Sequence, residues 1–422
     1  MTRQIVPRSR ARALSRAARS EPSAVSHCAV MNRPLRPGST ATAYVDLAAI
    51  ESNVRILREH APTAEFLAVV KADGYGHGLL PCARAARRAG AGWLGTARLD
   101  EALALREAGI DGRVFSWLHV PGADFAAALT RDIDLAAYAL WDLAEIATAA
   151  RATGRVARLH LKVDTGLGRG GAFGAGFTEL LHAARALEAE GCLRIVGLWS
   201  HLAYADEPDH PTVRHQQEVF DAAIAQAQAA GCRLEVRHLA NSAATLTNPG
   251  AHYDLVRPGI AVYGLTPVPQ LPDAASAGLT PAMTLVSRLA NVKDLPAGQG
   301  VSYGHQYVTE RATRVGLVPI GYADGVPRAA TNVGPLSVGG RRYRIAGRVC
   351  MDQVLVDLGP DHPAQAGDEV LLFGADPAGP TAQQWADAVG TISYEIVTRV
   401  GPRVERVHVN GVGEDDTGEG NA

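Results

Sequence analysis

The chain has 422 residues, of which 47% are hydrophobic and 20% are charged, and its formal net charge at pH 7 is −2. This length predicts two or three domains, and the composition is that of an ordinary globular protein. The small net charge excludes a strongly basic nucleic-acid binder, and no apolar run approaches the roughly 18 residues that a membrane span needs. The five cysteines form no CxxC pair, so neither a disulfide framework nor a zinc site is indicated.

The two ends of the chain are not expected to inform function. Residues 1–40 contain eight Arg and one Glu, which predicts a disordered Arg-rich extension. We interpret it as the product of a start codon assigned upstream of Met31, with an organelle transit peptide as the alternative. Residues 413–422 form an acidic tail that is also expected to be disordered.

Between residues 41 and 279, short apolar runs alternate with helical patterns. The clearest helical pattern covers residues 211–231 and ends at a glycine. Eight strand–helix alternations with continuously apolar strands predict a (β/α)8 TIM-type barrel, and a doubly wound sheet is the alternative. The eight predicted strands cover residues 65–71, 92–97, 113–118, 134–140, 157–164, 193–201, 235–241 and 255–264.

The pattern changes after residue 279. Residues 280–412 consist of short β-rich runs separated by Gly and Pro, and one helical pattern at 381–389 interrupts them. This texture predicts a separate C-terminal domain rich in β-strands.

The basic residues are unevenly divided between arginine and lysine. Of the 41 Lys and Arg residues, only Lys71, Lys162 and Lys293 are lysines. Arginine cannot form an imine and stays protonated in proteins, whereas it can replace lysine in most surface roles. Codon bias with three leftover lysines is one interpretation, and a chemical need for an amine at some of them is the other.

Two of these lysines fall where a barrel of this type has its active site, at the carboxyl ends of the strands. A phosphate site often follows the seventh and eighth strands of such barrels. A lysine that faces such a site suggests an imine with pyridoxal phosphate. The candidate residues at these strand ends are Lys71, Lys162, His201, Asn241, Ser242, Arg257, Gly259 and Ile260.

Nine motifs follow one another in order from about Ala41 to Asn410. They are VVKADGYGHG, KVDTGLGRGG, WSHLAYADE, LANSAA, VRPGIAVYG, VSYGHQY, PIGYADG, GRVCMDQ and TISYEIVTRVGPRV. Together they resemble the motifs of the alanine racemases, which are barrel-fold enzymes dependent on pyridoxal phosphate. The resemblance implies interconversion of L- and D-alanine in the cytoplasm, for bacterial peptidoglycan synthesis.

The resemblance implies a two-base mechanism. Lys71 matches the lysine that carries the cofactor as an aldimine and then acts as one base, and Tyr303 matches the second base. Arg257 matches the partner of the pyridine nitrogen, and together with His201 it supports the tyrosine. From the residues alone, His201 could equally be a hydrogen-bonded histidine at the barrel mouth, and Lys71 a lysine that reaches solvent.

Lys162 matches a lysine that carbon dioxide carbamylates in the family. The carbamate orients Arg169, which matches the residue that contacts the cofactor's phenolic oxygen and the substrate carboxylate. The alternative for Lys162 is an ordinary ion pair with Asp164 or Asp73. Lys293 lies in no motif and is expected to be a solvated surface lysine.

The remaining matches concern the phosphate, the entrance and a second subunit. Tyr75 and Tyr394 match tyrosines near the phosphate, although Tyr75 could be a packing residue. Tyr322 lines the entrance in the family with Asp352 as a supporting residue, and the backbone of Met351 meets the substrate carboxylate. The resemblance further implies a homodimer in which Tyr303 and Met351 complete the active site of the other subunit.

Two other functions remain open from the sequence. A related barrel enzyme could decarboxylate amino acids or racemise a broader range of them, but Arg257 and Tyr303 argue against decarboxylation. A cofactor-binding protein without enzymatic activity could share the barrel, but the motifs after residue 280 argue against it.

Overall fold

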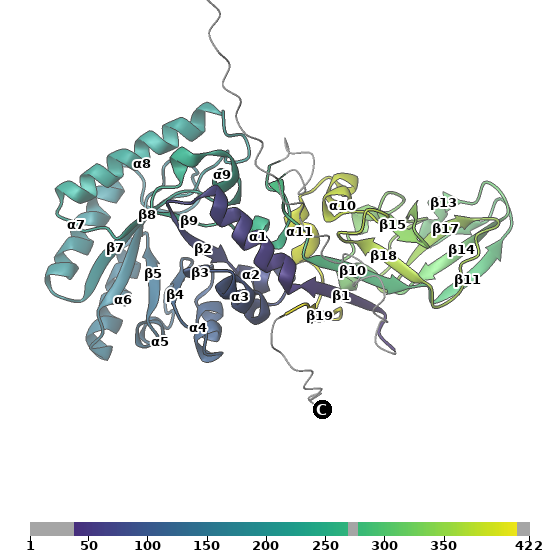
Figure 1. The fold of residues 1–422 in the computed structure, drawn as a ribbon, viewed down its shortest axis with the longest axis horizontal. Coiled ribbons are helices and arrows are strands. Elements are labelled where there is room, and N and C mark those ends of the chain that lie inside the picture. The colour runs from purple at the N-terminus through teal and green to yellow at the C-terminus, as the bar shows by residue number, and fades with distance from the viewer. Residues whose placement is uncertain (1–37, 269–276, 412–422) are drawn as a thin grey trace, which may run out of the picture. The chain divides into compact units, whose positions relative to one another are not determined.

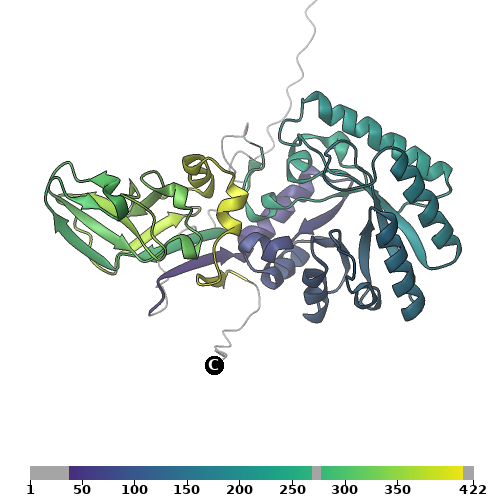
Figure 2. The same cartoon turned by 180° about the vertical axis from the view of Figure 1, so that it is seen from behind.

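The computed structural model describes residues 38–268 and 277–411 of the chain. The expectations for the segment before residue 38 and for the acidic tail 413–422 lie outside these ranges. Within them, the structure has a parallel barrel-like sheet surrounded by helices, followed by a part rich in antiparallel strands (Figures 1 and 2). This arrangement confirms the predicted fold class.

Eight parallel strands form the barrel sheet in the order β8-β7-β6-β5-β4-β3-β2-β9. Its two outer strands approach each other through backbone hydrogen bonds from Asp254 N to Arg237 O and from Arg257 N to Ala240 O, each 3.0 Å long. The sheet is therefore nearly closed, which excludes the doubly wound alternative. The strands are β2 Glu65–Val69, β3 Trp93–Thr96, β4 Arg113–Ser116, β5 Ile133–Ala137, β6 Ala157–Lys162, β7 Leu193–Trp199, β8 Val236–His238 and β9 Leu255–Val256.

Helices cover the outside of this sheet (Figure 1). Four of them begin at a side chain that accepts a backbone N–H. The four capping residues are Asp46 (from Ala49 N, 3.1 Å), Asp124 (from Ala127 N, 2.9 Å), His210 (from Thr212 N, 3.2 Å) and Asn241 (from Ala244 N, 3.1 Å). The helices are α1 Leu47–His60, α2 Lys71–Gly76, α3 Leu79–Arg88, α4 Leu99–Glu107, α5 Phe125–Thr130, α6 Leu140–Thr153, α7 Ala175–Ala189, α8 Pro211–Ala229 and α9 Ser242–Thr247.

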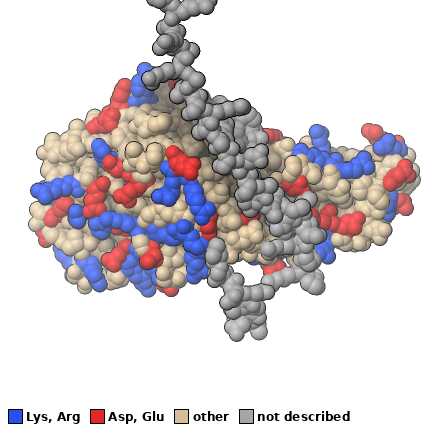
Figure 3. Space-filling view, in the orientation of Figure 1, with Lys and Arg blue, Asp and Glu red and all other residues tan. Residues whose placement is uncertain are grey.

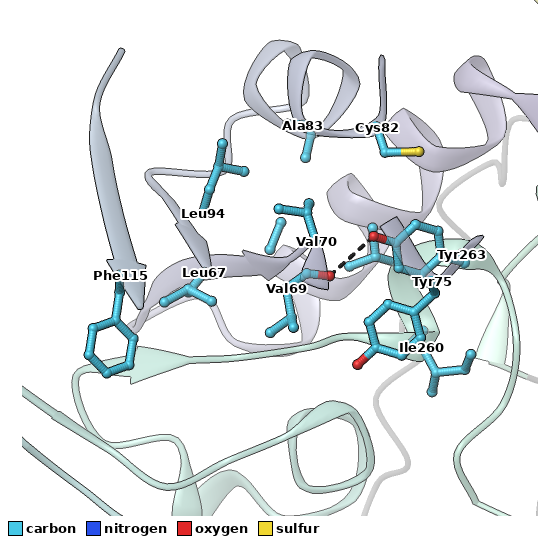
Figure 4. Packing of buried hydrophobic residues seen from close by; sticks show 14 of the residues in the cluster. Leu67, Val69, Val70, Tyr75, Cys82, Ala83, Leu94, Phe115, Ile260 and Tyr263 are labelled. Carbon is cyan, nitrogen blue, oxygen red and sulfur yellow. Dashed lines mark hydrogen bonds between the residues drawn. The ribbon is translucent and has the colours of Figure 1, made fainter. Parts of the chain in front are cut away.

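The barrel interior is filled by apolar and aromatic side chains, among them Leu67, Val69 and Phe115 (Figure 4). Tyr263 packs into the same cluster, and its hydroxyl donates to the carbonyl of Val69 at 3.2 Å. Burial of this cluster, at about 25 cal/mol per Å² of apolar surface, is the main force that holds the barrel together.

The predicted eighth strand is wrong over most of its length. Only Leu255–Val256 is extended, because Pro258 has no N–H to donate to a neighbouring strand. The chain then turns into a short 3₁₀ helix, Ile260–Tyr263 (η3). Arg257 and Gly259 therefore follow the strand rather than lie on it, which brings them to the barrel mouth.

Three sheets make up the strand-rich part, with orders β16-β15-β18-β10-β1-β19, β11-β14-β17 and β12-β13. The predicted helix at 381–389 is confirmed as α10 Ala382–Val389, and α11 Ser393–Thr398 follows it. The strands are β1 Ala41–Asp46, β10 Met283–Arg288, β11 Asn291–Leu295, β12 Gly300–Val301, β13 Tyr307–Val308, β14 Thr313–Val318, β15 Pro335–Val338, β16 Arg341–Arg344, β17 Val354–Gly359, β18 Glu369–Phe373 and β19 Glu405–Val409.

Strand β1 corrects the expectation that the barrel region begins at residue 41. It pairs antiparallel with β10 and parallel with β19, so the first described strand belongs to the large sheet of the strand-rich part. A strand pattern indicates which faces are buried but not which strand is the neighbour. The barrel elements begin with α1.

Charged side chains of both signs are interspersed on the face shown in Figure 3, in keeping with the small net charge. The described cysteines, Cys82, Cys192, Cys232 and Cys350, are free thiols. None of the helices in residues 38–268 and 277–411 combines the length and the apolar composition that crossing a membrane requires.

Candidate active site

Lys71 leads into an unusual left-handed turn rather than ending a strand. The four residues Ala72–Tyr75 have φ between 53° and 59° and positive ψ. Each non-glycine residue in this conformation costs about 1–2 kcal/mol, and Gly74 relieves only one of the four positions. Backbone strain of this kind is kept where the surroundings enforce it, often at functional sites.

Hydrogen bonds from both sides enforce the turn. The N–H of Asp73 donates to Glu101 Oε1 at 3.1 Å. On the other side, His77 Nδ1 lies 3.1 Å from the carbonyl oxygen of Gly74 and 2.9 Å from that of Tyr75. Carbonyls only accept, so Nδ1 carries the proton. The turn therefore fixes the position of Lys71 relative to Tyr75 at the end of β2.

Burial and the nearby cation of Arg169 lower the pKa of Lys71, and Glu101 partly opposes this. The same factors, in a stronger form, act on Lys162. Burial, Arg169 and Arg257 lower the pKa of Lys162 to about 8, against the opposing effect of Asp164. Both lysines thus have a larger share of neutral amine than an exposed lysine has at the same pH.

Lys162 is 8% exposed, and its Nζ lies 4.6 Å from the centre of the Trp199 ring. Its Nζ forms no ion pair among the described residues, which contradicts the pairing with Asp164 or Asp73 that the sequence left open. Asp164 instead accepts the backbone N–H groups of Gly166 and Gly168, at 3.0 and 3.1 Å. Arg169 is exposed at the rim of the same loop.

Arg257 is the most firmly held side chain of the site. It is 5% exposed, and its Nη2 donates to the carbonyls of Ser200 at 2.8 Å and Leu239 at 3.2 Å. The same nitrogen lies 3.4 Å from His201 Nδ1, and Nη1 lies 3.2 Å from His238 Nδ1. Within the described residues Nε donates no hydrogen bond, so it remains available to a ligand.

His201 lies beside this cation and is neutral. Burial and the positive charges of Arg257, Arg169, Lys162 and Lys71 lower its pKa well below the usual value. Burial lowers the pKa of Arg257 itself to about 9, so the guanidinium is charged at neutral pH.

Five of the predicted residues form one corner of the barrel mouth. Ser242 Oγ accepts the N–H of Gly259 at 2.7 Å, and a Cβ on Gly259 would lie only 2.2 Å from the hydroxyl of Tyr75. The Tyr75 ring lies 6.2 Å from that of Tyr394, between ring centres. The N–H of Ile260 has no partner inside η3, because it is the first residue of that helix.

Asn241 has a structural part in this corner. Its side chain accepts the N–H of Ala244 at 3.1 Å and so begins helix α9 with Ser242 as its first residue. The hydroxyls of Ser242, Tyr75 and Tyr394, together with free backbone N–H groups at the starts of helices, are the kind of donors that a phosphate group requires.

Apart from Tyr394, the predicted residues after residue 280 are exposed. Tyr303 is 69% exposed, Met351 53% and Tyr322 43%. The loop of Met351 is tied to Tyr322, whose N–H donates to Cys350 O at 3.0 Å. Asp352 is exposed as well and pairs with Arg403 at 2.8 Å. No hydrogen bond, ion pair or ring contact of the described residues joins these side chains to the barrel mouth.

Sequence reasoning missed several residues that the structure joins to this site. Glu101 and His77 hold the turn after Lys71, and His238 and His160 lie behind Arg257. His160 and Lys162 are two positions apart in β6, so the period-two rule places both on the inner face of the barrel. That spacing was a signal that could have found His160.

Two protein-family models match the chain in succession. The model described as the N-terminal domain of alanine racemase covers residues 45–267, and that of the C-terminal domain covers residues 282–408.

Relatives and solved structures agree over nearly the whole matched length. The alanine racemase of Frankia casuarinae is 58% identical over 368 residues, which are 87% of this chain and 96% of the relative. That of Streptomyces coelicolor is 55% identical over 88% of this chain and 96% of its own. The crystal structure of alanine racemase from D-cycloserine-producing Streptomyces lavendulae has a TM-score of 0.87 and 54% identity, covering 89% and 98% of the two chains. A Bacillus anthracis alanine racemase with bound L-Ala-P has a TM-score of 0.80 and 34% identity, covering 88% and 95%.

Proposed function

The chain belongs to the alanine racemase family, and from this membership we propose that it interconverts L- and D-alanine with Lys71 and Tyr303 as two opposed bases. One observation carries the proposal. At the barrel mouth the partly buried Lys71, the buried Arg257 and the corner of hydroxyl and N–H donors around Ser242 come together. The D-alanine formed would serve peptidoglycan synthesis in the cytoplasm, as the family resemblance implies.

Pyridoxal 5'-phosphate fits this mouth. The lack of a side chain at Gly259 lets the Tyr75 hydroxyl reach this corner, and Ser242, Ile260 and Tyr394 would supply further donors for the phosphate. Arg257 Nε, which donates no hydrogen bond within the described residues, would donate to the ring nitrogen. Bound at this mouth, the cofactor would withdraw electrons from the α-carbon of a substrate that has replaced Lys71 on it, which would make the α-proton removable.

The protein's part of the reaction is to move one proton on each face of that carbon. Lys71 Nζ takes or returns the proton on one face, since burial and Arg169 favour its neutral form. The Tyr303 hydroxyl does the same on the other face. Removal by one base and delivery by the other invert the configuration.

Arg257 favours racemisation over decarboxylation. Because the guanidinium is a permanent donor, it cannot hand a proton to the ring nitrogen as a carboxylic acid could. A cofactor ring held by Arg257 would therefore store little of the negative charge, and the α-carbon would be reprotonated quickly. This argument opposes the decarboxylase alternative.

Lys162 is proposed to carry a carbamate. Its neutral amine adds to carbon dioxide with formation of an N–C bond and release of a proton, and the resulting anion can orient Arg169 toward the substrate carboxylate. The absence of an ion pair at Lys162 Nζ among the described residues supports this assignment. Intact mass spectrometry in bicarbonate buffer should show the added carboxyl group, and a bare amine there would contradict it.

Incubation with L-alanine in deuterated water tests the main proposal. We expect D-alanine with deuterium at the α-carbon. Release of carbon dioxide together with an amine would instead establish the decarboxylase. Serine and other small amino acids in the same assay measure how broad the specificity is.

A second subunit is proposed to supply Tyr303 and the backbone of Met351, because both are exposed within one chain. Mixing the inactive variants Lys71→Arg and Tyr303→Phe tests this. In a mixed dimer, one site combines the intact lysine of one chain with the intact tyrosine of the other. Random exchange of chains should restore about a quarter of the wild-type activity, whereas no recovery would show that each chain uses its own tyrosine.

A further inference from the structure

A chain of buried polar side chains runs through the barrel interior behind Arg257. His238 Nδ1 lies 3.2 Å from Arg257 Nη1, and His238 Nε2 lies 2.8 Å from His160 Nδ1. His160 Nε2 in turn lies 3.3 Å from Asp134 Oδ2. Both imidazoles are 0% exposed, and none of the reaction steps above uses them.

The protons in this chain can have only one order. A guanidinium only donates hydrogen bonds, so His238 Nδ1 must accept from Arg257. His238 then carries its proton on Nε2 and donates to His160 Nδ1. His160 for the same reason carries its proton on Nε2 and donates to the carboxylate of Asp134. Every hydrogen bond thus points away from the barrel mouth.

Asp134, at the far end of this row of polar side chains, is held by arginine side chains. Asp134 is 3% exposed and pairs with Arg158 at 3.0 Å and with Arg113 at 3.3 Å. Both arginines also pair with Glu235, at 2.7 and 3.1 Å. The two arginines hold this carboxylate in place, and a carboxylate accepts hydrogen bonds, so it is the acceptor for the N–H of His160.

The barrel interior leaves room for the Asp134, His160 and His238 side chains and shields them from water. A Cβ on Gly197 would lie 2.2 Å from His160 Nδ1, so a side chain at that position would displace the imidazole. Phe115 packs on His160 and His238, with ring centres 4.5 and 5.5 Å apart, and Trp199 stacks on His238 at 5.7 Å. In these apolar surroundings an unpaired polar atom is costly, so the order of donors is strongly enforced.

We propose that Asp134, His160 and His238 form a one-way hydrogen-bond relay that positions Arg257 for its contact with the cofactor. The relay takes one N–H of Nη1, and the carbonyls of Ser200 and Leu239 take those of Nη2. Among the described residues, this leaves the N–H of Nε and the second N–H of Nη1 as donors for a ligand. These three are positioning residues. The contact with the cofactor rests on the proposed function, whereas the order of protons does not.

Nitrogen-15 spectra of the histidine rings test the order of protons directly. With labelled histidine in the full chain at neutral pH, we expect His160 and His238 as neutral rings with the proton on Nε2. The variants His160→Gln and His238→Gln assign the signals. A proton on Nδ1 of either ring, or two protons on one ring, would overturn the relay whether or not the protein racemises alanine.

Three variants then separate positioning from packing. Glutamine at residue 160 can accept through Oε1 and donate through Nε2, whereas leucine can do neither. We expect His160→Leu to lower kcat for alanine by about tenfold to a hundredfold with little change in KM, and His160→Gln to recover most of the loss. Phe115→Leu, which removes packing but no polar atom, should leave kcat near the wild-type value. Equal losses in His160→Leu and Phe115→Leu, or no recovery by glutamine, would reduce the relay to packing.

Discussion

The barrel mouth and the exposed surface of the strand-rich part hold their functional candidates in opposite ways. Arg257 and Lys162 are 5% and 8% exposed, and Arg257 is fixed by hydrogen bonds within the chain. Tyr303 and Met351 are 69% and 53% exposed, and no contact of the described residues draws them to the barrel mouth. Folding of one chain therefore preorganises half of the proposed site, and the other half would, under our proposal, depend on assembly with a second chain.

The most damaging change should be Lys71→Arg in the preorganised half. Arginine keeps the positive charge but cannot bind the cofactor covalently, so racemisation and the visible absorbance of the bound cofactor should both be lost. Lys293→Arg, an exposed lysine on β11, is the matched control and should change neither. Normal absorbance in Lys71→Arg would remove this lysine from the proposed role.

Tyr303→Phe should be the next largest loss and lies in the half that depends on assembly. Without the hydroxyl one face lacks its base, so racemisation should fall by about 10²–10⁴-fold while the cofactor absorbance stays. Tyr307→Phe in the nearby strand β13, which loses only a bond to Asp357, serves as control. Full racemisation by the Tyr303 variant would refute the two-base assignment.

Lys162→Met should show a smaller effect, on stability, whose size depends on pH. An unfolded lysine titrates near 10.4, whereas burial and Arg169 lower the pKa of Lys162 in the folded chain to about 8. Without carbon dioxide, the buried charge costs the wild type about 3 kcal/mol at pH 7, and this cost fades as the pH rises from about 8 to 10.

The measurement is denaturant unfolding of both proteins in buffer free of carbon dioxide, at pH 7 and at about pH 9.5. The methionine variant should be more stable at pH 7, and its advantage should shrink at the higher pH. A difference that does not depend on pH would show that Lys162 has an ordinary pKa.

The smallest effect is expected for Asp352→Asn. It removes the ion pair with Arg403 on the exposed surface, which contributes little to the stability of an isolated chain because solvent screens it. Unfolding measured at low and high protein concentration sharpens the comparison, because a larger loss at high concentration would show that a second chain covers this pair. A large loss of stability at every protein concentration would contradict the conclusion that this ion pair is exposed to solvent.

Much of this site could be predicted from the sequence because strand ends in a parallel barrel meet at one mouth. The placement of Lys71, His201, Ser242 and Arg257 follows from that rule together with the motifs. The left-handed turn was not predictable in detail, because it depends on Glu101 and His77 as well as on the local glycines.

Features that depend on a choice of partner were also beyond the sequence. The pattern of Ala41–Asp46 predicts a strand but does not say that its neighbours are β10 and β19. In the same way, His160 and His238 are 78 positions apart, and only the closed sheet brings their rings together.

The pairing of β1 has a consequence for how the protein is made. This strand lies between β10 and β19, so the first described strand finds its second neighbour only at residues 405–409. The intervening chain must be synthesised before that pairing can form, and closing so long a loop is slow. A ribosome-bound chain halted before β19 should therefore hold a folded barrel with an open sheet edge, and it would be exposed to aggregation until its last strand emerges.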